Sequence, residues 1–236
     1  MKSQFLFERY EIKYLINKEQ YYNFLKSIQD FIKEDEYSHS TIYNIYFDTP
    51  NNQLIRKSIE KPVYKEKLRL RSYVPVNDKS YIFLELKKKY KNVVYKRRMK
   101  INYKKALDFI NNPGSESQIS KEITYFIKYY KTLEPKMFLY YDRTSYVSLN
   151  DENIRITFDN NIVYRNYDLR LEKGIYGNKL IDDETYVLEI KTNTSLPIWL
   201  VKALSKEKIY KTSFSKYGYA YENIYLKERK CYGKFI

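Results

Sequence analysis

Apolar and charged side chains alternate along many short segments of this chain, and such alternation predicts β-strands with one buried face. Residues 65–73 read Lys-Glu-Lys-Leu-Arg-Leu-Arg-Ser-Tyr. All the charges expected on one face of this strand are positive; they belong to Lys65, Lys67, Arg69 and Arg71. Like charges on one strand face repel each other, so such a row is retained mainly where a polyanion neutralises it.

Seven other segments share this alternation, so about eight strands are expected. They span residues 5–15, 41–49, 81–89, 93–101, 135–147, 154–159 and 186–192. Helical spacing of apolar residues predicts helices at 17–33, 104–111, 117–131 and 197–206, a short helix or turn at 54–59, and a closing helix from Ser215. His39 is expected in a loop before a strand, and residues 161–184 show no regular pattern.

The charge balance points to an acidic partner. The 236 residues include 44 Lys and Arg against 29 Asp and Glu, a formal net charge of +15. Such an excess indicates nucleic acid, an anionic membrane or a phosphorylated small molecule.

The scarcity of histidine and cysteine excludes two classes of site. His39 and Cys231 are the only residues of their types, so neither a zinc site nor a Ser-His triad can be assembled. A lone cysteine and the lack of a signal peptide or an 18-residue apolar run predict a cytoplasmic, soluble protein without a membrane span. We expect residues 1–236 to form one domain.

Eight such strands predict an α+β fold containing a closed antiparallel eight-stranded β-barrel. Its interior would be charged, and helices would cover the apolar faces outside. Glu-x-Lys recurs on three strands, as Glu11/Lys13, Glu85/Lys87 and Glu189/Lys191. A tunnel lined by cations and a few carboxylates suits linear phosphate chains, because phosphoryl transfer needs positioning and charge more than a covalent nucleophile.

A set of short motifs follows one order along residues 5–220. It comprises Arg9-x-Glu11-x-Lys13-Tyr14, Tyr46-Phe47-Asp48-Thr49, Lys67-x-Arg69-x-Arg71, Glu85-Leu86-Lys87, Lys96-x-Arg98, Tyr141-x-Arg143, Arg155-Ile156-Thr157-Phe158-Asp159, Leu188-Glu189-Ile190-Lys191 and Ser215-Lys216-Tyr217. This ordered set resembles the VTC domain, the vacuolar transporter chaperone polyphosphate polymerase family within the triphosphate tunnel metalloenzymes. The wider superfamily opens with Glu-x-Glu-x-Lys, whereas this chain has Arg9 in place of the first Glu.

The resemblance implies transfer of the γ-phosphate of ATP to a growing polyphosphate chain, assisted by Mn²⁺ or Mg²⁺. It implies catalytic roles for Lys67, Arg69, Arg71, Arg143, Arg155 and Glu189. It implies substrate binding by Lys13, Lys87, Lys96, Arg98, Lys191, Ser215 and Lys216. Glu189 is the implied main metal ligand, with weaker candidates in Glu11, Glu85 and Asp159.

Several alternatives stay open. Glu11 and Glu85 can pair with the neighbouring basic strands instead of holding a metal. The same tunnel can hydrolyse triphosphate or polyphosphate if water replaces phosphate as the acceptor. A non-enzymatic polyanion or nucleic-acid binder is the third hypothesis, although no RNP-like or KH-like motif occurs and no nucleic-acid partner is expected. The partners implied are ATP and polyphosphate or pyrophosphate, and the sequence identifies no membrane-protein partner.

Overall fold

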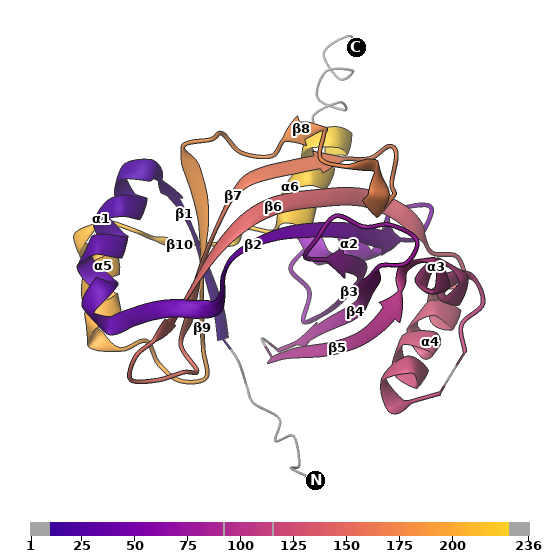
Figure 1. The fold of residues 1–236 in the computed structure, drawn as a ribbon, viewed down its shortest axis with the longest axis horizontal. Coiled ribbons are helices and arrows are strands. Elements are labelled where there is room, and N and C mark those ends of the chain that lie inside the picture. Colours follow the sequence, from indigo (N-terminus) through magenta and orange to yellow (C-terminus); the bar gives the residue numbers. More distant parts are fainter. Residues whose placement is uncertain (1–9, 92, 115, 227–236) are drawn as a thin grey trace.

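The fold is built on one large antiparallel sheet (Figure 1). The computed structural model describes residues 10–91, 93–114 and 116–226. Its strands are β1 (Tyr10–Asn17), β2 (Ile32–Asp48), β3 (Tyr64–Ser72), β4 (Tyr81–Tyr90), β5 (Val93–Asn102), β6 (Glu134–Ser148), β7 (Arg155–Arg165), β8 (Asn178–Lys179), β9 (Thr185–Thr192) and β10 (Lys211–Thr212). They are ordered β10-β1-β9-β7-β6-β2-β3-β4-β5, with β8 paired to β7.

The sheet is curved but open, so the prediction of a closed eight-stranded barrel is wrong. Over the residues described above, no backbone pairing joins β10 to β5 at the two ends of the strand order. The strand count rises to ten because β8 and β10 are two-residue strands without an alternating pattern. The prediction of an α+β fold with an antiparallel sheet is confirmed.

Cross-strand pairing extends two strands beyond their sequence patterns. The helix expected at 17–33 ends at Ile28, and β2 begins at Ile32, where it pairs with Ser148 of β6. His39 therefore lies within β2 and pairs with Thr144, contrary to the expected loop. Strand β7 likewise continues to Arg165 through part of the segment that shows no pattern in the sequence.

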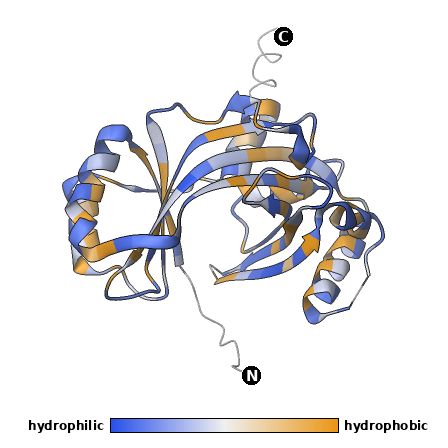
Figure 2. Ribbon diagram, in the orientation of Figure 1, coloured by the Kyte–Doolittle hydropathy of each residue, from blue (hydrophilic) through white to orange (hydrophobic). Residues whose placement is uncertain are grey.

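Two helical layers cover the outer face of the sheet. Helices α3 (Tyr103–Asn111) and α4 (Gln118–Tyr130) pack on the apolar faces of β3 and β4, whereas α1 (Lys18–Ile28) and α5 (Ile198–Lys206) pack on β1, β7 and β9. Figure 2 shows apolar and polar positions mixed along these strands. The expected outward direction of these apolar faces is confirmed.

Two further helices, α2 (Gln53–Ile59) and α6 (Lys216–Tyr221), contribute to a third apolar cluster. This cluster includes Tyr46, Leu139 and Tyr141, whose faces of β2 and β6 also carry the charged residues described below. Asp48 joins the two helices, because its carboxylate accepts from the Leu54 and Ile55 amides and from the Tyr217 hydroxyl. The expectation that all helices lie outside is therefore wrong for α2 and α6.

The chain continues from α6 into a single π-helical turn, Glu222–Leu226. The expected beginning of the first strand, including Arg9, lies outside the described residues, as do the end of the closing helix and Cys231. Within the described part, no helix is long and apolar enough to cross a membrane.

Candidate functional site

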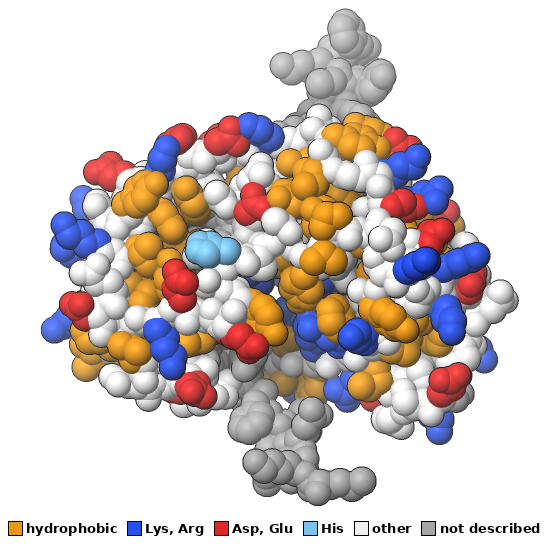
Figure 3. All heavy atoms as spheres, in the orientation of Figure 1, with side chains coloured by type: hydrophobic (Ala, Val, Ile, Leu, Met, Phe, Trp, Pro, Cys, Tyr) orange, Lys and Arg blue, Asp and Glu red, His pale blue; other side chains and the backbone are white. Residues whose placement is uncertain are grey.

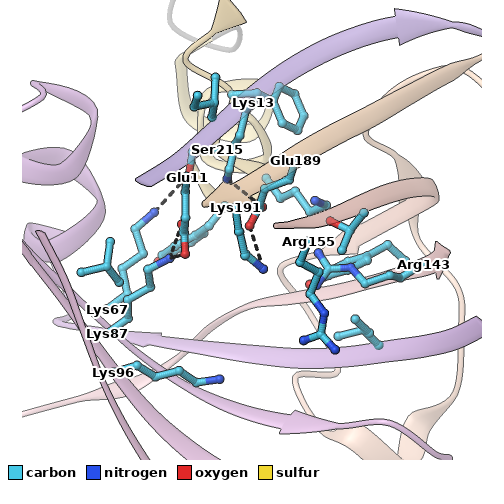
Figure 4. Close-up of a pocket in the computed structure, with 18 of the residues that line it drawn as sticks. Glu11, Lys13, Lys67, Lys87, Lys96, Arg143, Arg155, Glu189, Lys191 and Ser215 are labelled. Carbon is cyan, nitrogen blue, oxygen red and sulfur yellow. Dashed lines mark hydrogen bonds and ion pairs between the residues drawn. The ribbon is translucent and has the colours of Figure 1, made fainter. Parts of the chain in front are cut away.

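The concave face of the sheet encloses a cavity of about 2760 Å³ lined by basic side chains. Figure 3 shows Lys and Arg side chains gathered in a central hollow, and Figure 4 shows cations reaching into it from several strands. The cavity brings together most of the residues implied by the resemblance: Glu11, Lys13, Lys67, Arg69, Arg71, Lys87, Lys96, Arg98, Arg143, Arg155, Glu189, Lys191, Ser215 and Lys216. Glu85 and Asp159 lie behind these side chains and do not line the cavity.

Glu85 is the centre of the cation cluster on β3, β4 and β5. The side chain of this buried carboxylate is only 1% exposed. It lies 2.7 Å from Arg69, 2.6 Å from Arg98, 2.8 Å from Lys96 and 3.8 Å from Arg71. The strand register explains the arrangement, because Arg69 and Arg98 are the residues directly opposite Glu85 on its two neighbouring strands.

The electrostatics of this cluster keep Glu85 ionised. Burial alone would raise the pKa of Glu85, but the charges of Arg69, Arg71 and Lys96 outweigh it and hold the pKa far below its usual range. The alternative that Glu85 pairs with basic strands is therefore what the geometry shows. Its oxygens are engaged by guanidinium and ammonium donors, which makes it a poor metal ligand.

A second buried carboxylate, Asp159, orients two cations on the opposite wall. Arg143 donates to both oxygens of Asp159, at 2.5 and 2.7 Å, and Lys216 donates at 2.5 Å. Burial would raise the pKa of Asp159, but these two cations lower it to about 2. Asp159 thus acts as a fixed counter-charge beneath Arg143 and Lys216.

The third carboxylate, Glu189, lines the cavity, unlike Glu85 and Asp159. Its oxygens lie 3.0 Å from Lys191 and 3.7 Å from Lys13, which is opposite Glu189 in the β1–β9 register. Burial would raise the pKa of Glu189, but Lys191, Lys13 and Arg143 hold it well below normal. Glu189 also opposes ionisation of the nearby Glu11, so these two carboxylates lie within electrostatic reach of each other.

Glu11 connects the two ends of the open sheet. Its carboxylate accepts from Lys87 of β4 at 2.7 and 3.0 Å, although β1 and β4 lie near opposite ends of the strand order. Figure 4 shows this pair reaching across the cavity. The charged faces therefore converge on one enclosed space, as the sequence predicts, although side chains rather than backbone bonds bridge the gap.

The segment Ser215-Lys216-Tyr217 fixes three parts of the cavity wall at once. The Ser215 hydroxyl accepts from Lys67 at 3.0 Å, Lys216 binds Asp159, and the Tyr217 ring stacks on Tyr46 at 4.7 Å. The Ser215 hydroxyl also accepts from the Gly218 amide and so caps α6. The beginning of α6 therefore places a polar segment against β3 and β7.

Three tyrosines that the sequence does not single out as site residues hold the arginines. Tyr46 accepts from Arg69 at 2.9 Å, and Tyr141 accepts from Arg71 at 3.0 Å. In the same way, Tyr73 accepts from Arg98 at 2.7 Å. Burial would raise the pKa of Tyr141, but Arg71 and Arg143 lower it to about 8. The only available signal is that Tyr46 and Tyr141 belong to two of the ordered motifs.

Lys67 is a buried cation without a carboxylate partner among the described residues, and this predicts a pH effect. It forms no ion pair with a described residue, and burial together with Lys13, Lys65, Lys87 and Arg69 lowers its pKa to about 7. A bound phosphate would restore the ammonium, so binding above pH 7 requires proton uptake. Tripolyphosphate affinity should fall by up to about tenfold per pH unit above 7, relative to a Lys67→Gln variant.

Isothermal titration calorimetry in buffers of different ionisation enthalpy checks this prediction. Near pH 8, wild type should take up close to one more proton than Lys67→Gln on binding. The same linkage gives the free protein a stability that rises with pH between about 7 and 10.5, because there the unfolded chain holds the proton that the folded one has lost. Equal proton uptake by both proteins would contradict the assignment.

Arg155 is restrained by Asp35, a cavity residue that the sequence does not predict. Asp35 pairs with the Arg155 guanidinium from the part of β2 where its register to β6 shifts, between Glu34 and His39. A phosphate must compete with Asp35 for Arg155. We expect Asp35→Asn to tighten tripolyphosphate binding about threefold, a modest effect because Arg155 is partly solvent-exposed.

The matched control is Asp30→Asn, which removes the same charge from an exposed position that does not line the cavity. It should leave the dissociation constant within measurement error of wild type. Weaker binding by Asp35→Asn would show that Asp35 holds Arg155 in the binding position instead of competing for it.

The carboxylates offer a small but usable set of metal ligands. Among the described residues, no group of three or more His, Cys, Asp and Glu side chains is placed to hold an ion. Mg²⁺ needs only one or two carboxylates when substrate phosphates complete its shell. Glu85 and Asp159 do not line the cavity, whereas Glu189 and Glu11 do, so Glu189 and Glu11 are the residues that fit this requirement.

Two solved structures share the fold of this chain. A candidate adenylate cyclase from Bacillus halodurans matches with a TM-score of 0.56 and 14% identity, over 88% of this chain and 95% of that one. A candidate adenylyl cyclase from Hippeastrum, described by its dominant triphosphatase activity, matches with a TM-score of 0.50 and 17% identity, over 88% of this chain and 92% of that one. These identities show a shared fold only, and a search of curated proteins finds no match.

The family model of the VTC domain matches residues 8–225. This range includes every strand of the sheet and both buried carboxylate clusters. The chain belongs to the VTC domain family.

Proposed function

We propose that this protein is a polyphosphate polymerase that transfers the γ-phosphoryl group of ATP to the end of a growing polyphosphate chain. The observation that carries the proposal is the convergence of cations from β1, β3, β4, β5, β6, β7 and β9 on one cavity. Carboxylates hold many of these cations from behind, so the cavity surface presents positive charge to a ligand. VTC family membership supports phosphate chains as that ligand.

The arginines are the principal donors to the transferring phosphoryl group in this proposal. Arg69 and Arg98 are fixed by Glu85, and Arg143 is fixed by Asp159. Such anchoring fixes the guanidinium N–H donors in position before the reaction, so they need not reorganise during it. This preorganisation is the main source of electrostatic catalysis. Arg71 and Arg155 extend the same surface, and Lys67 contributes the charge that depends on pH.

The reaction breaks the bond between the γ-phosphorus and the oxygen that bridges to the β-phosphate, and the electron pair leaves with ADP. A terminal oxygen of the polyphosphate chain supplies the electron pair for the new phosphorus–oxygen bond. Protons are not required for this exchange, and a covalent protein nucleophile is not needed. The chain's own residues bind both phosphates, align them and balance the charge on the non-bridging oxygens.

Glu189, with Glu11 beside it, would hold a divalent cation, Mn²⁺ or Mg²⁺. Such an ion would offset the negative charge that develops on the phosphoryl group during transfer. Lys13 and Lys191 flank Glu189 and would contact the phosphates next to this position.

The test is the product formed from ATP and Mn²⁺ by the purified protein. Long-chain polyphosphate together with ADP supports the polymerase. Orthophosphate without any polymer would reject it.

A metal-dependent triphosphatase or polyphosphatase is the second candidate. It is favoured by the fold shared with the Hippeastrum protein, whose dominant activity is that of a triphosphatase. The same cavity serves both reactions, because only the acceptor changes from phosphate to water. Orthophosphate released from tripolyphosphate in the product assay would support this candidate.

A further inference from the structure

Four lysines that are not among the predicted site residues lie around one end of the cavity. We call them the lysine rim, and they are Lys61, Lys65, Lys89 and Lys211. They come from the loop before β3, from β3, from β4 and from β10. Lys61 and Lys211 are exposed, so this end of the cavity reaches solvent.

The rim continues the basic ladder of β3 and β4. Lys65 lies directly opposite Lys89, and the next inward-facing pair is Lys67 opposite Lys87. Two successive like-charge pairs across a strand pair are destabilising. Toward the other end of the same ladder, the opposed pair is Arg69 and Glu85, which carry opposite charges. The ladder therefore changes along its length from a pair of opposite charges to pairs of like charge, in which only Lys87 has a carboxylate partner, Glu11, in the described ranges.

The rim lysines form no ion pair with any carboxylate in the described ranges. Lys65 has only a long contact of 3.4 Å to the Ser58 carbonyl oxygen. Burial and the charges of Lys89, Lys13, Lys87 and Lys61 lower the pKa of Lys65. Burial also lowers the pKa of Lys89; Glu11 opposes this effect, and Lys87, Lys13 and Lys211 add to it. The positive charges of the rim lysines therefore repel one another.

The cavity is larger than one nucleotide needs. Its volume of about 2760 Å³ compares with roughly 300–1,000 Å³ for ordinary small-molecule pockets. From the Arg71 pair to the Lys65 pair, the ladder spans six residues, which is ~20 Å of strand. A single triphosphate group cannot reach along this whole length, whereas an extended chain of phosphates can.

We propose that the lysine rim is a second phosphate-binding subsite, which holds the part of a linear polyphosphate chain beyond the three phosphates nearest the Glu85 cluster. This inference rests on the proposed function for the identity of the polymer. It adds a polarity to the cavity: the reacting phosphates lie among the arginines, and the rest of the chain leaves past the rim lysines.

Binding measurements without turnover test this proposal. Dissociation constants for tripolyphosphate and for long-chain polyphosphate are compared in wild type and in the double variant Lys65→Gln/Lys89→Gln. Wild type should bind the long chain about tenfold or more tightly than tripolyphosphate. The variant should lose most of this advantage, while its tripolyphosphate affinity stays within about threefold of wild type.

The matched control is Lys104→Gln/Lys105→Gln, which removes two exposed charges from α3, away from the cavity. It should keep the chain-length advantage. Equal weakening of both ligands by the rim variant would overturn the proposal, because the lysines would then act only through the general field. A wild type that binds both ligands with equal affinity would overturn it as well. So would single-stranded RNA, if the rim variant lost as much affinity for RNA as it lost for long-chain polyphosphate.

The binding test of the lysine rim and the product test of the proposed function can fail independently. A chain-length advantage that depends on the rim supports this inference even where ATP gives only orthophosphate, which rejects the polymerase. In the converse case, wild type forms polymer from ATP while the rim variant binds long chains as tightly as wild type does. That combination would support the polymerase and reject the subsite.

Discussion

Replacing Glu85 with glutamine should be the most destabilising single change in the cavity wall. The variant keeps the shape of the side chain but removes the one carboxylate shared by Arg69, Lys96 and Arg98. Breaking a buried ionic cluster by removing one partner costs about 3–5 kcal/mol, because the remaining charges are left uncompensated. That is a large part of the total stability of a typical domain.

Urea denaturation with and without tripolyphosphate measures this effect. The anion can supply the charge that Glu85→Gln removes, so it should stabilise the variant more than it stabilises wild type. The control Glu152→Gln alters an exposed carboxylate and should stay within about 0.5 kcal/mol of wild type. If Glu85→Gln unfolded at the wild-type urea concentration, the cluster would not need its carboxylate.

Replacing Glu189 with glutamine should have the largest effect on turnover. Glu189 lines the cavity, and in the proposed reaction it is the main ligand of the divalent cation. Loss of metal-assisted charge stabilisation is worth several kcal/mol, so ATP turnover should fall by about two to three orders of magnitude. Tripolyphosphate binding without metal should be unchanged or tighter, because a negative charge leaves the cavity.

The contrast between turnover and binding separates a metal-holding role from a structural one. Glu184→Gln is the control, since Glu184 is exposed and pairs only with Lys18 outside the cavity. Its turnover should match wild type at every metal concentration. A Glu189→Gln protein with the wild-type metal dependence would remove Glu189 from the proposed site.

The alternation of charged and apolar residues predicted which face of each recognised strand is directed toward the cavity. A period of two fixes the face of every residue once a strand is recognised, so Lys67, Arg69 and Arg143 could be assigned without coordinates. Arg97, next to Lys96 and Arg98 in the sequence, lies on the other face of β5 and pairs with Glu122 of the outer helix α4.

The openness of the sheet could not be predicted in this way. Closure depends on whether the terminal strands share backbone hydrogen bonds, and side-chain alternation carries no information about that. Asp35 was missed for a related reason. It lies in the β2 segment where the register shifts, and a one-residue shift changes the face on which a side chain lies.

The roles of the carboxylates were the other part that sequence could not settle. The family resemblance implies Glu189 as the main metal ligand and Glu11, Glu85 and Asp159 as weaker candidates, but all four lie among basic residues in the sequence. Distances separate them, because Asp159 and Glu85 are enclosed by cations whereas Glu189 lines the cavity.

Across the seam between β1 and β4, the contact between Lys87 and Glu11 is an ion pair and not a backbone hydrogen bond, so we expect it to respond to salt and to ligand. A closed strand ladder would be indifferent to ionic strength, whereas an ion pair weakens as salt rises. A bound polyanion would compete with Glu11 for Lys87 and would therefore weaken the ion pair that connects β1 to β4.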